Sequence, residues 1–194
     1  MSKESTRLAL LEAGKRVFLE KGYNSAGLEA ILQAAGVPKG SFYYYFTSKE
    51  DFGLKVIDRF AECYVAEYGR YLDDETMRPL ERLQRYFEAV TARLEEKGCR
   101  NGCLIGNLSQ EMADQNEAFR TRLEEVLEAW VRRIAACLRQ AQRAGEIPGH
   151  LDPHELAEFC LNNWEGAILR AKTMRSTAPL KTFLDMMFGH VLRA

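Results

Sequence analysis

Apolar side chains recur along this chain every three or four residues, which is the spacing that places them on one face of an α-helix. Alternating runs of β-branched residues, and the Asn-Gly turns that join strands, are missing. The longest apolar stripe consists of Phe119, Leu123, Val126, Leu127, Trp130, Ile134 and Leu138. The sequence therefore predicts an all-α protein, and the breaks in the pattern divide it into about nine helices.

Glycine, proline and capping residues predict where the helices begin and end. The first helix ends at Gly22, a second short helix ends at Gly36, and a third covers residues 39–46. Ser48 is placed to cap a long fourth helix, and Asp152, followed by proline, is placed to cap a later one.

The composition is that of a soluble globular protein. Of the 194 residues, 46% are hydrophobic and 28% are charged. No run of about 18 apolar residues is present, and the charged N-terminus has no apolar signal core. We therefore expect a cytoplasmic protein that does not enter a membrane.

The five cysteines are scattered, odd in number and without a C-x-x-C pair, so we expect free thiols in a reducing compartment. The three histidines form no metal-ligand pattern with them, so neither a metal site nor a cofactor is expected. The net charge of −1 hides a small asymmetry, since residues 1–57 carry +2 and the remainder −3. The sign favours phosphate contact by the N-terminal part.

Three short helices within about the first 50 residues fit a helix-turn-helix. Small residues at 34–36 let the next helix cross closely, and Val37 can fill the space between the two. The expected recognition helix, residues 39–46, begins with a lysine and contains five aromatic residues and a serine. A helix of this kind offers amides, hydroxyl groups and a cation to the DNA backbone and to base edges.

The aromatic run of this helix cannot all be buried, because successive helical residues point about 100° apart. Phe42 and Phe46, four residues apart, are expected to pack inward. The expected DNA contacts are Lys39, Gly40, Ser41, Tyr43, Tyr44, Tyr45 and Lys49. An ordinary solvated side chain remains an alternative for Lys49.

The stretch from Gly22 to Glu50 resembles the signature of the TetR family of bacterial transcription regulators. It reads GYNSAGLEAILQAAGVPKGSFYYYFTSKE and contains a glycine-aromatic pair, A-G-V, an aromatic cluster ending in Phe, and S-K-E. It departs from the family at Gly27, where threonine is usual, and at Glu29, where a basic residue is common. The resemblance implies a DNA-binding domain at residues 1–50 and a helical ligand-binding and dimerisation domain at residues 51–194. It also implies a homodimer, formed by the last two helices, on a near-palindromic operator.

Residues 102–111 (GCLIGNLSQE) and 166–172 (GAILRAK) resemble a smaller branch of the family, the NemR-like and AcuR-like regulators. The branch implies an electrophilic or acrylate-like inducer, with Cys103 as the reactive thiol and Lys172 close to it. A cysteine at a helix start after a glycine-rich break has amides nearby that favour the thiolate. We add Asn107 and Trp164 to the expected ligand-binding or redox-sensing residues. The alternative is that Cys103 is only a small buried side chain.

Taken as a whole, the sequence predicts a homodimeric DNA-binding regulator, expected to be a repressor, that a small-molecule inducer releases from double-stranded DNA. A noncovalent apolar or acrylate-like inducer is an alternative to reaction at Cys103, and a helical protein-binding adaptor is an alternative to DNA binding. An enzyme is not expected, because the chain has no Gly-rich phosphate loop, no G-x-S-x-G and no H-E-x-x-H motif. The inducer, the operator, and the choice between repression and activation stay open.

Overall fold

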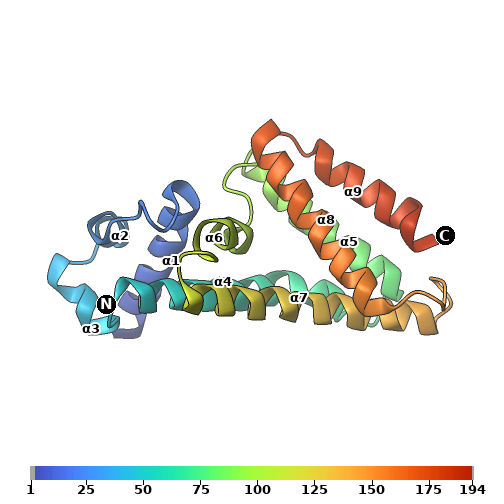
Figure 1. Cartoon of the computed structure of the whole chain (residues 1–194), viewed down its shortest axis with the longest axis horizontal. Helices are drawn as coiled ribbons and strands as arrows, with labels where there is room; N and C mark the ends of the chain where they lie inside the picture. The colour runs from blue at the N-terminus through green and yellow to red at the C-terminus, as the bar shows by residue number, and fades with distance from the viewer. Residues whose placement is uncertain (1–2, 194) are drawn as a thin grey trace. The chain divides into compact units, whose positions relative to one another are not determined.

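The computed structural model describes residues 3–193, and within them all regular structure is helical (Figure 1). The described helices are α1 (Lys3–Lys21), α2 (Leu28–Ala35), α3 (Phe42–Tyr45), α4 (Lys49–Leu72), α5 (Pro79–Glu96), α6 (Leu104–Met112), α7 (Glu117–Arg143), α8 (Pro153–Met174) and α9 (Ala178–Gly189). Two 3₁₀ turns accompany them, η1 (Lys39–Ser41) and η2 (Val191–Arg193). The expectation of an all-α protein with about nine helices is confirmed.

The chain divides into two compact units, each of which is built from two segments. The first unit contains residues 1–63 and 103–126, and the second contains residues 64–102 and 127–194. The helices α4 and α7 continue from one unit into the other, since residues 63 and 126 lie inside them.

The first unit holds α2 against α1 through a short apolar face. Ile31 and Leu32 are buried, and Val37 is buried directly after the turn. Gly36 makes that turn with a φ of 65°, which only glycine adopts without strain, and its amide donates to the carbonyl of Gln33. The position of α2, and of the residues on its first turn, is therefore fixed by packing.

The third helix is shorter than the sequence predicts. A 3₁₀ turn occupies Lys39–Ser41, where the Ser41 amide donates to the carbonyl of Pro38 over 3.0 Å, and the α-helix begins only at Phe42. Glycine at 40 accounts for part of the difference, because glycine has a low helix propensity. The helix ends where Phe46 turns to an extended backbone, with φ −137° and ψ 136°.

The expected capping residues are in place at two helix starts. The Ser48 hydroxyl accepts from the Asp51 amide over 3.0 Å at the start of α4. The Asp152 carboxylate accepts from the amides of His154 and Glu155 at the start of α8, and these bonds hold its pKa below the ordinary value. Both caps satisfy amides that a helix cannot pair internally.

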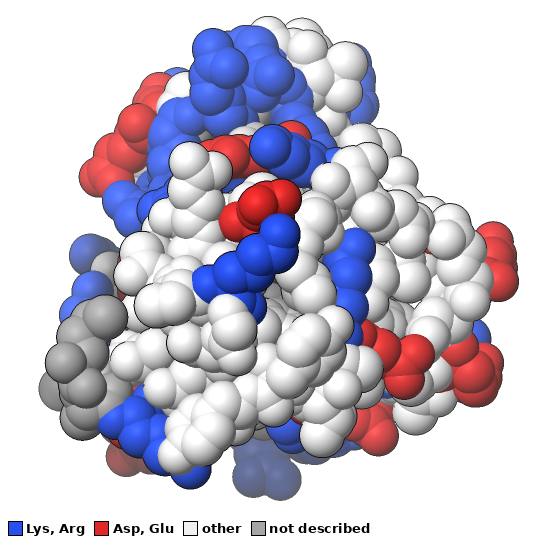
Figure 2. Space-filling model, turned by 90° about the vertical axis from the view of Figure 1, so that its left-hand side faces the viewer, with Lys and Arg blue, Asp and Glu red and all other residues white. Residues whose placement is uncertain are grey.

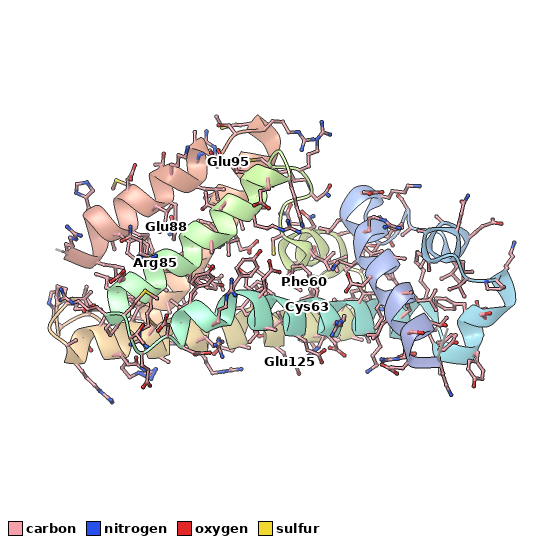
Figure 3. All side chains as sticks on the ribbon, turned by 180° about the vertical axis from the view of Figure 1, so that it is seen from behind. Phe60, Cys63, Arg85, Glu88, Glu95 and Glu125 are labelled. Atoms are coloured by element: carbon pink, nitrogen blue, oxygen red, sulfur yellow. The ribbon has the colours of Figure 1, made fainter. Side chains whose placement is uncertain are left out.

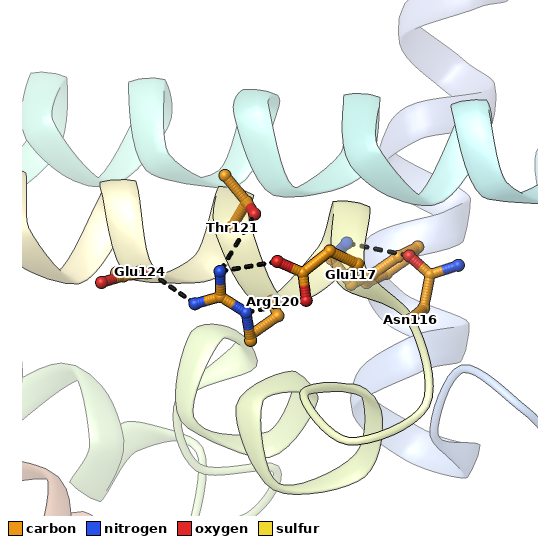
Figure 4. Close-up of polar contacts among 6 residues, drawn as sticks. Asn116, Glu117, Arg120, Thr121 and Glu124 are labelled. Atoms are coloured by element: carbon orange, nitrogen blue, oxygen red, sulfur yellow. Dashed lines mark hydrogen bonds and ion pairs between the residues drawn. The ribbon is translucent and has the colours of Figure 1, made fainter.

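A polar network surrounds the start of α7 in the first unit (Figure 4). The Asn116 side-chain oxygen accepts from the Phe119 amide over 3.0 Å, which caps the helix. Arg120 donates to Glu117 and to Glu124 over 2.7 and 2.6 Å, and these bonds raise the pKa of its guanidinium. Since these side chains are exposed, the cap matters more for the helix than the ion pairs do.

The second unit is built around an aromatic cluster. Phe87 of α5, Trp164 of α8 and Phe183 of α9 pack with ring centres 4.8 to 5.1 Å apart. The opposite face of α5 is polar, and Arg85 and Glu88 lie on it (Figure 3). Within residues 3–193 there is no helix that is both long enough and apolar enough to cross a membrane.

Candidate functional site

The aromatic rings of the expected DNA reader, the recognition helix of residues 39–46, fall into a buried group and an exposed group. Phe42 and Phe46 are buried against Phe52 of α4, with ring centres 5.3 and 4.8 Å away. Tyr43 and Tyr44 are 69% and 66% exposed. The expectation that the two phenylalanines pack inward is confirmed, and the two tyrosines are open to an external partner.

The turn that precedes α3 presents its residues in different ways. Lys39 is exposed and its Nζ lies 3.4 Å from Oε1 of Glu29 on α2. A Cβ added at Gly40 would meet nothing within 4 Å, so its backbone is open on that side. Ser41 and Tyr45 are half-buried. Their expected DNA contacts stay predictions.

Lys49 lies against the loop between α1 and α2. Its Nζ donates to the carbonyl of Asn24 over 3.4 Å and lies 4.5 Å from the centre of the Tyr23 ring. Burial lowers the pKa of Lys49, and the nearby Glu111 carboxylate opposes that shift. This lysine therefore has an internal role in holding the loop, and its expected phosphate contact stays a prediction.

Two basic residues near the start of α1 extend the exposed surface, and the sequence analysis did not single them out. Lys3 places its Nζ 4.5 Å from the centre of the Tyr44 ring, and the Arg7 guanidinium lies 6.0 Å from that of Phe46. Their signal in the sequence was a basic charge close to the N-terminus. Figure 2 looks toward the side of Figure 1 on which α2 and α3 lie, and it shows basic groups next to a broad uncharged area.

Glu111, at the C-terminal end of α6, holds the loop between α1 and α2. Its two carboxylate oxygens accept from the backbone amides of Tyr23 and Asn24, each over 2.8 Å. Gly22, with a φ of 79°, allows this approach, because a Cβ there would lie 2.8 Å from a Glu111 oxygen. The sequence analysis gave Glu111 no role, since no local pattern relates it to a loop almost 90 residues earlier.

Cys103, the expected reactive thiol, is the N-cap residue of α6 in the first unit. Its carbonyl accepts from the amide of Asn107 over 3.0 Å, and the residue is 9% exposed. Asn107 is half-buried one turn into the helix. The expected place of Cys103 at the start of a helix is confirmed, and its thiol is largely shielded from solvent.

Trp164 and Lys172, the other two expected sensing residues, lie on α8 in the second unit. Trp164 is buried, and its indole N–H has no hydrogen-bond partner. Lys172 is half-buried in the last turn of the helix. An unpaired donor in an apolar cluster is costly, so a ligand acceptor that reached Trp164 would gain a hydrogen bond.

The cysteines differ in accessibility. Of the five, all of which lie in the described part of the chain and are free thiols, Cys63 on α4 is half-buried and the others are buried (Figure 3). Burial raises the pKa of Cys137 to about 11, and its thiol donates to the carbonyl of Pro79 over 3.1 Å. Burial also raises the pKa of Cys160. Cys63 is therefore the thiol most open to a soluble reagent.

An apolar groove of about 660 Å³ lies along α8 and α9 in the second unit. Phe159, Leu169 and Met186, which line it, are 47 to 51% exposed. Asn162, Asn163, Gly166, Ala167, Arg170, Pro179, Thr182, Phe183, Met187 and Val191 complete the lining. Large apolar side chains exposed together in this way are typical of a surface that binds another protein.

Two family models match the chain. The model described as bacterial regulatory proteins of the tetR family matches residues 10–54, and the model described as a tetracyclin repressor-like C-terminal domain matches residues 79–187. Both descriptions are of regulators, which confirms the expectation that the chain is not an enzyme.

Curated proteins and a solved structure are similar over almost the whole chain. The transcriptional regulator AcuR of Cereibacter sphaeroides is 45% identical over 94% of this chain and 83% of its own length. The transcriptional repressor DhaR of Mycobacterium sp. strain GP1 is 40% identical over 99% of this chain and 95% of its own. The crystal structure of the reduced form of Escherichia coli NemR superimposes with a TM-score of 0.88 at 29% identity, covering 95% of both chains.

Proposed function

Because this chain belongs to the TetR family of bacterial DNA-binding transcriptional repressors, we propose that it binds a near-palindromic operator as a homodimer and that a small-molecule inducer releases it. Residues 1–50 would form the DNA-binding domain, and residues 51–194 would bind the inducer and the second subunit. The observation that carries the proposal is the sorting of the reader's aromatic rings, with Tyr43 and Tyr44 exposed over buried phenylalanines. Since a regulator of this kind acts on bacterial DNA, we also propose that it acts in the cytoplasm.

The apolar groove along α8 and α9 supports the homodimer. In a two-fold dimer the same surface of each subunit meets itself and has to be self-complementary, and homodimer interfaces are richer in apolar side chains than the rest of the surface. Phe159 and Leu169 of α8 and Met186 of α9 provide such a face. Two recognition helices related by a two-fold axis would then read two half-sites of an inverted repeat.

An electrophile that reacts with Cys103 is the inducer class that we propose. The thiolate sulfur would attack the β-carbon of a Michael acceptor and form an S–C bond, while the π electrons move to the α-carbon, which takes a proton from water. The similarity to NemR, whose solved structure is described as the reduced form, supports a thiol-based response. A noncovalent inducer is the second candidate, and the buried, unpaired indole N–H of Trp164 favours it.

The test follows binding of the purified protein to the DNA beside its own gene while N-ethylmaleimide is titrated in. Wild type, Cys103→Ala and Cys63→Ala are compared, since Cys63 is the more accessible thiol. We expect the reagent to release wild type and Cys63→Ala from the DNA, while Cys103→Ala stays bound. Mass spectrometry of the same samples identifies which thiol carries the adduct.

Two other outcomes would revise the proposal in different ways. If Cys63→Ala alone stayed bound to the DNA, Cys63 and not Cys103 would be the thiol that responds. Tight binding of all three proteins with Cys103 fully modified would refute covalent induction and leave the noncovalent inducer. Lack of specific DNA binding before any reagent is added would refute the operator proposal itself.

A further inference from the structure

An acidic residue lies beside the expected reader. Glu29, on the first turn of α2, approaches Lys39 at the start of η1, with Oε1 and Nζ 3.4 Å apart. The two side chains are 81% and 82% exposed. An ion pair as exposed as this adds little to stability, so both groups are available to an external partner.

The backbones that carry this pair are fixed, although the side chains are free. Packing of Ile31 and Leu32 holds α2, and the amide of Val37 donates to the carbonyl of Leu32 over 3.0 Å across the turn. The hydrogen bond from Ser41 to Pro38 holds η1. A donor and an acceptor are thus presented side by side at a constant place on the surface.

This arrangement matches the major-groove edge of a G·C base pair. Guanine offers the O6 and N7 acceptors there, and the cytosine N4 amino group offers a donor. O6 and N4 are themselves hydrogen-bonded, so they lie roughly 2.9 Å apart, close to the 3.4 Å between Nζ and Oε1. Lys39 would donate to guanine while Glu29 accepts the free N4 hydrogen of its partner cytosine.

We propose that Glu29 is a specificity-determining residue that, together with Lys39, selects one G·C base pair in each half-site. The proposal rests on the proposed DNA reader and deepens it. A carboxylate near DNA is repelled by phosphates, so Glu29 lowers the affinity for all duplexes unless a cytosine N4 group satisfies it. An A·T base pair lacks the two adjacent acceptors, O6 and N7, that guanine offers to Lys39. The thymine methyl group also lies beside O4, so the two side chains fit an A·T pair less well.

The experiment is selection from a library of random duplexes by the full-length protein, followed by affinity measurements on the selected site and its single-base variants. Wild type is compared with Glu29→Ala, Glu29→Gln and Lys39→Ala. Glu117→Ala is the matched control, because it removes the same charge from an exposed ion pair on α7. Thermal melts establish that each variant is folded.

We expect wild type to prefer G·C at one position of each half-site by about 10-fold or more over any other pair. Glu29→Ala should reduce that preference to about threefold or less and bind non-specific duplexes more tightly, while Glu117→Ala behaves as wild type. The double variant Glu29→Ala/Lys39→Ala should discriminate at this position no worse than Lys39→Ala alone, because both groups read the same pair.

Four results would overturn the proposal. Identical base preferences in wild type and Glu29→Ala would show that the carboxylate reads nothing, and a uniform gain in affinity would leave it only a repulsive role. Selection of A·T at the affected position by wild type would refute the assigned pair. Failure of wild type to select any sequence would refute the reader as a whole, which distinguishes that failure from an error about Glu29.

Discussion

Removal of the Glu111 carboxylate should weaken the first unit measurably. The carboxylate accepts two hydrogen bonds of 2.8 Å from consecutive backbone amides, those of Tyr23 and Asn24. The Tyr23 amide is part-buried, so Glu111→Ala leaves it without a partner, whereas the exposed Asn24 amide can bond to water.

The size of the effect follows from these environments. A hydrogen bond to a charged group contributes about 1.5 to 3 kcal/mol when the remaining partner is not resolvated. Counting the Tyr23 bond fully and the Asn24 bond only slightly, we expect Glu111→Ala to lower the free energy of unfolding by about 2 kcal/mol. Glu111→Gln keeps one oxygen acceptor and should lose about half of that.

Thermal unfolding followed by circular dichroism measures the change, and all samples have one protein concentration because the stability of the proposed dimer would depend on it. A loss of 2 kcal/mol corresponds to a drop in Tm of about 4 to 8 °C for a chain of this size. Glu95→Ala, at an exposed position on α5, is the control. A Tm of Glu111→Ala within about 1 °C of wild type would show that the two bonds contribute nothing net.

Two further predictions concern packing and thiol reactivity. Gly14→Ala should destabilise the protein by about 1 to 3 kcal/mol in urea unfolding, because the new Cβ would lie 2.4 Å from a ring carbon of Phe52. Gly27→Ala, where a Cβ meets nothing within 4 Å, is the control, and equal loss in both would contradict the packing argument. In alkylation with iodoacetamide followed by mass spectrometry, Cys63 should react before the buried Cys137 at neutral pH. The rate at Cys137 should rise about tenfold per pH unit toward its pKa of about 11, and equally fast labelling of both at pH 7.5 would refute the effect of burial.

Much of the fold could be read from local pattern. The ends of α1 and α2, the start of α6 and the caps of α4 and α8 follow from glycine, serine and aspartate at positions where helices need them. The division of the aromatic run also followed from helical geometry, since residues four apart share a face and neighbouring residues do not. The 3₁₀ turn at Lys39–Ser41 was missed, because the prediction gave too little weight to the low helix propensity of Gly40.

The candidate site was predicted less completely. The signature of residues 22–50 identified the reader, and the position of Cys103 before a helix was correct. The pairing of Glu29 with Lys39 and the approach of Lys3 to Tyr44 were missed, because each joins residues on different elements. The contact of the Lys49 ammonium with the Tyr23 ring was missed for the same reason, and the expected DNA contact of Lys49 stays a prediction.

The sequence by itself determined the helices, most of their ends and the family, since these depend on spacing and on the conformational preferences of neighbouring residues. The tertiary structure decided which polar groups meet. The Glu111 carboxylate accepts hydrogen bonds from the amides of Tyr23 and Asn24, and Glu29 forms an ion pair with Lys39. Hydrogen bonds and ion pairs act over a few ångströms, and only folding brings residues 10 or 88 positions apart to that distance.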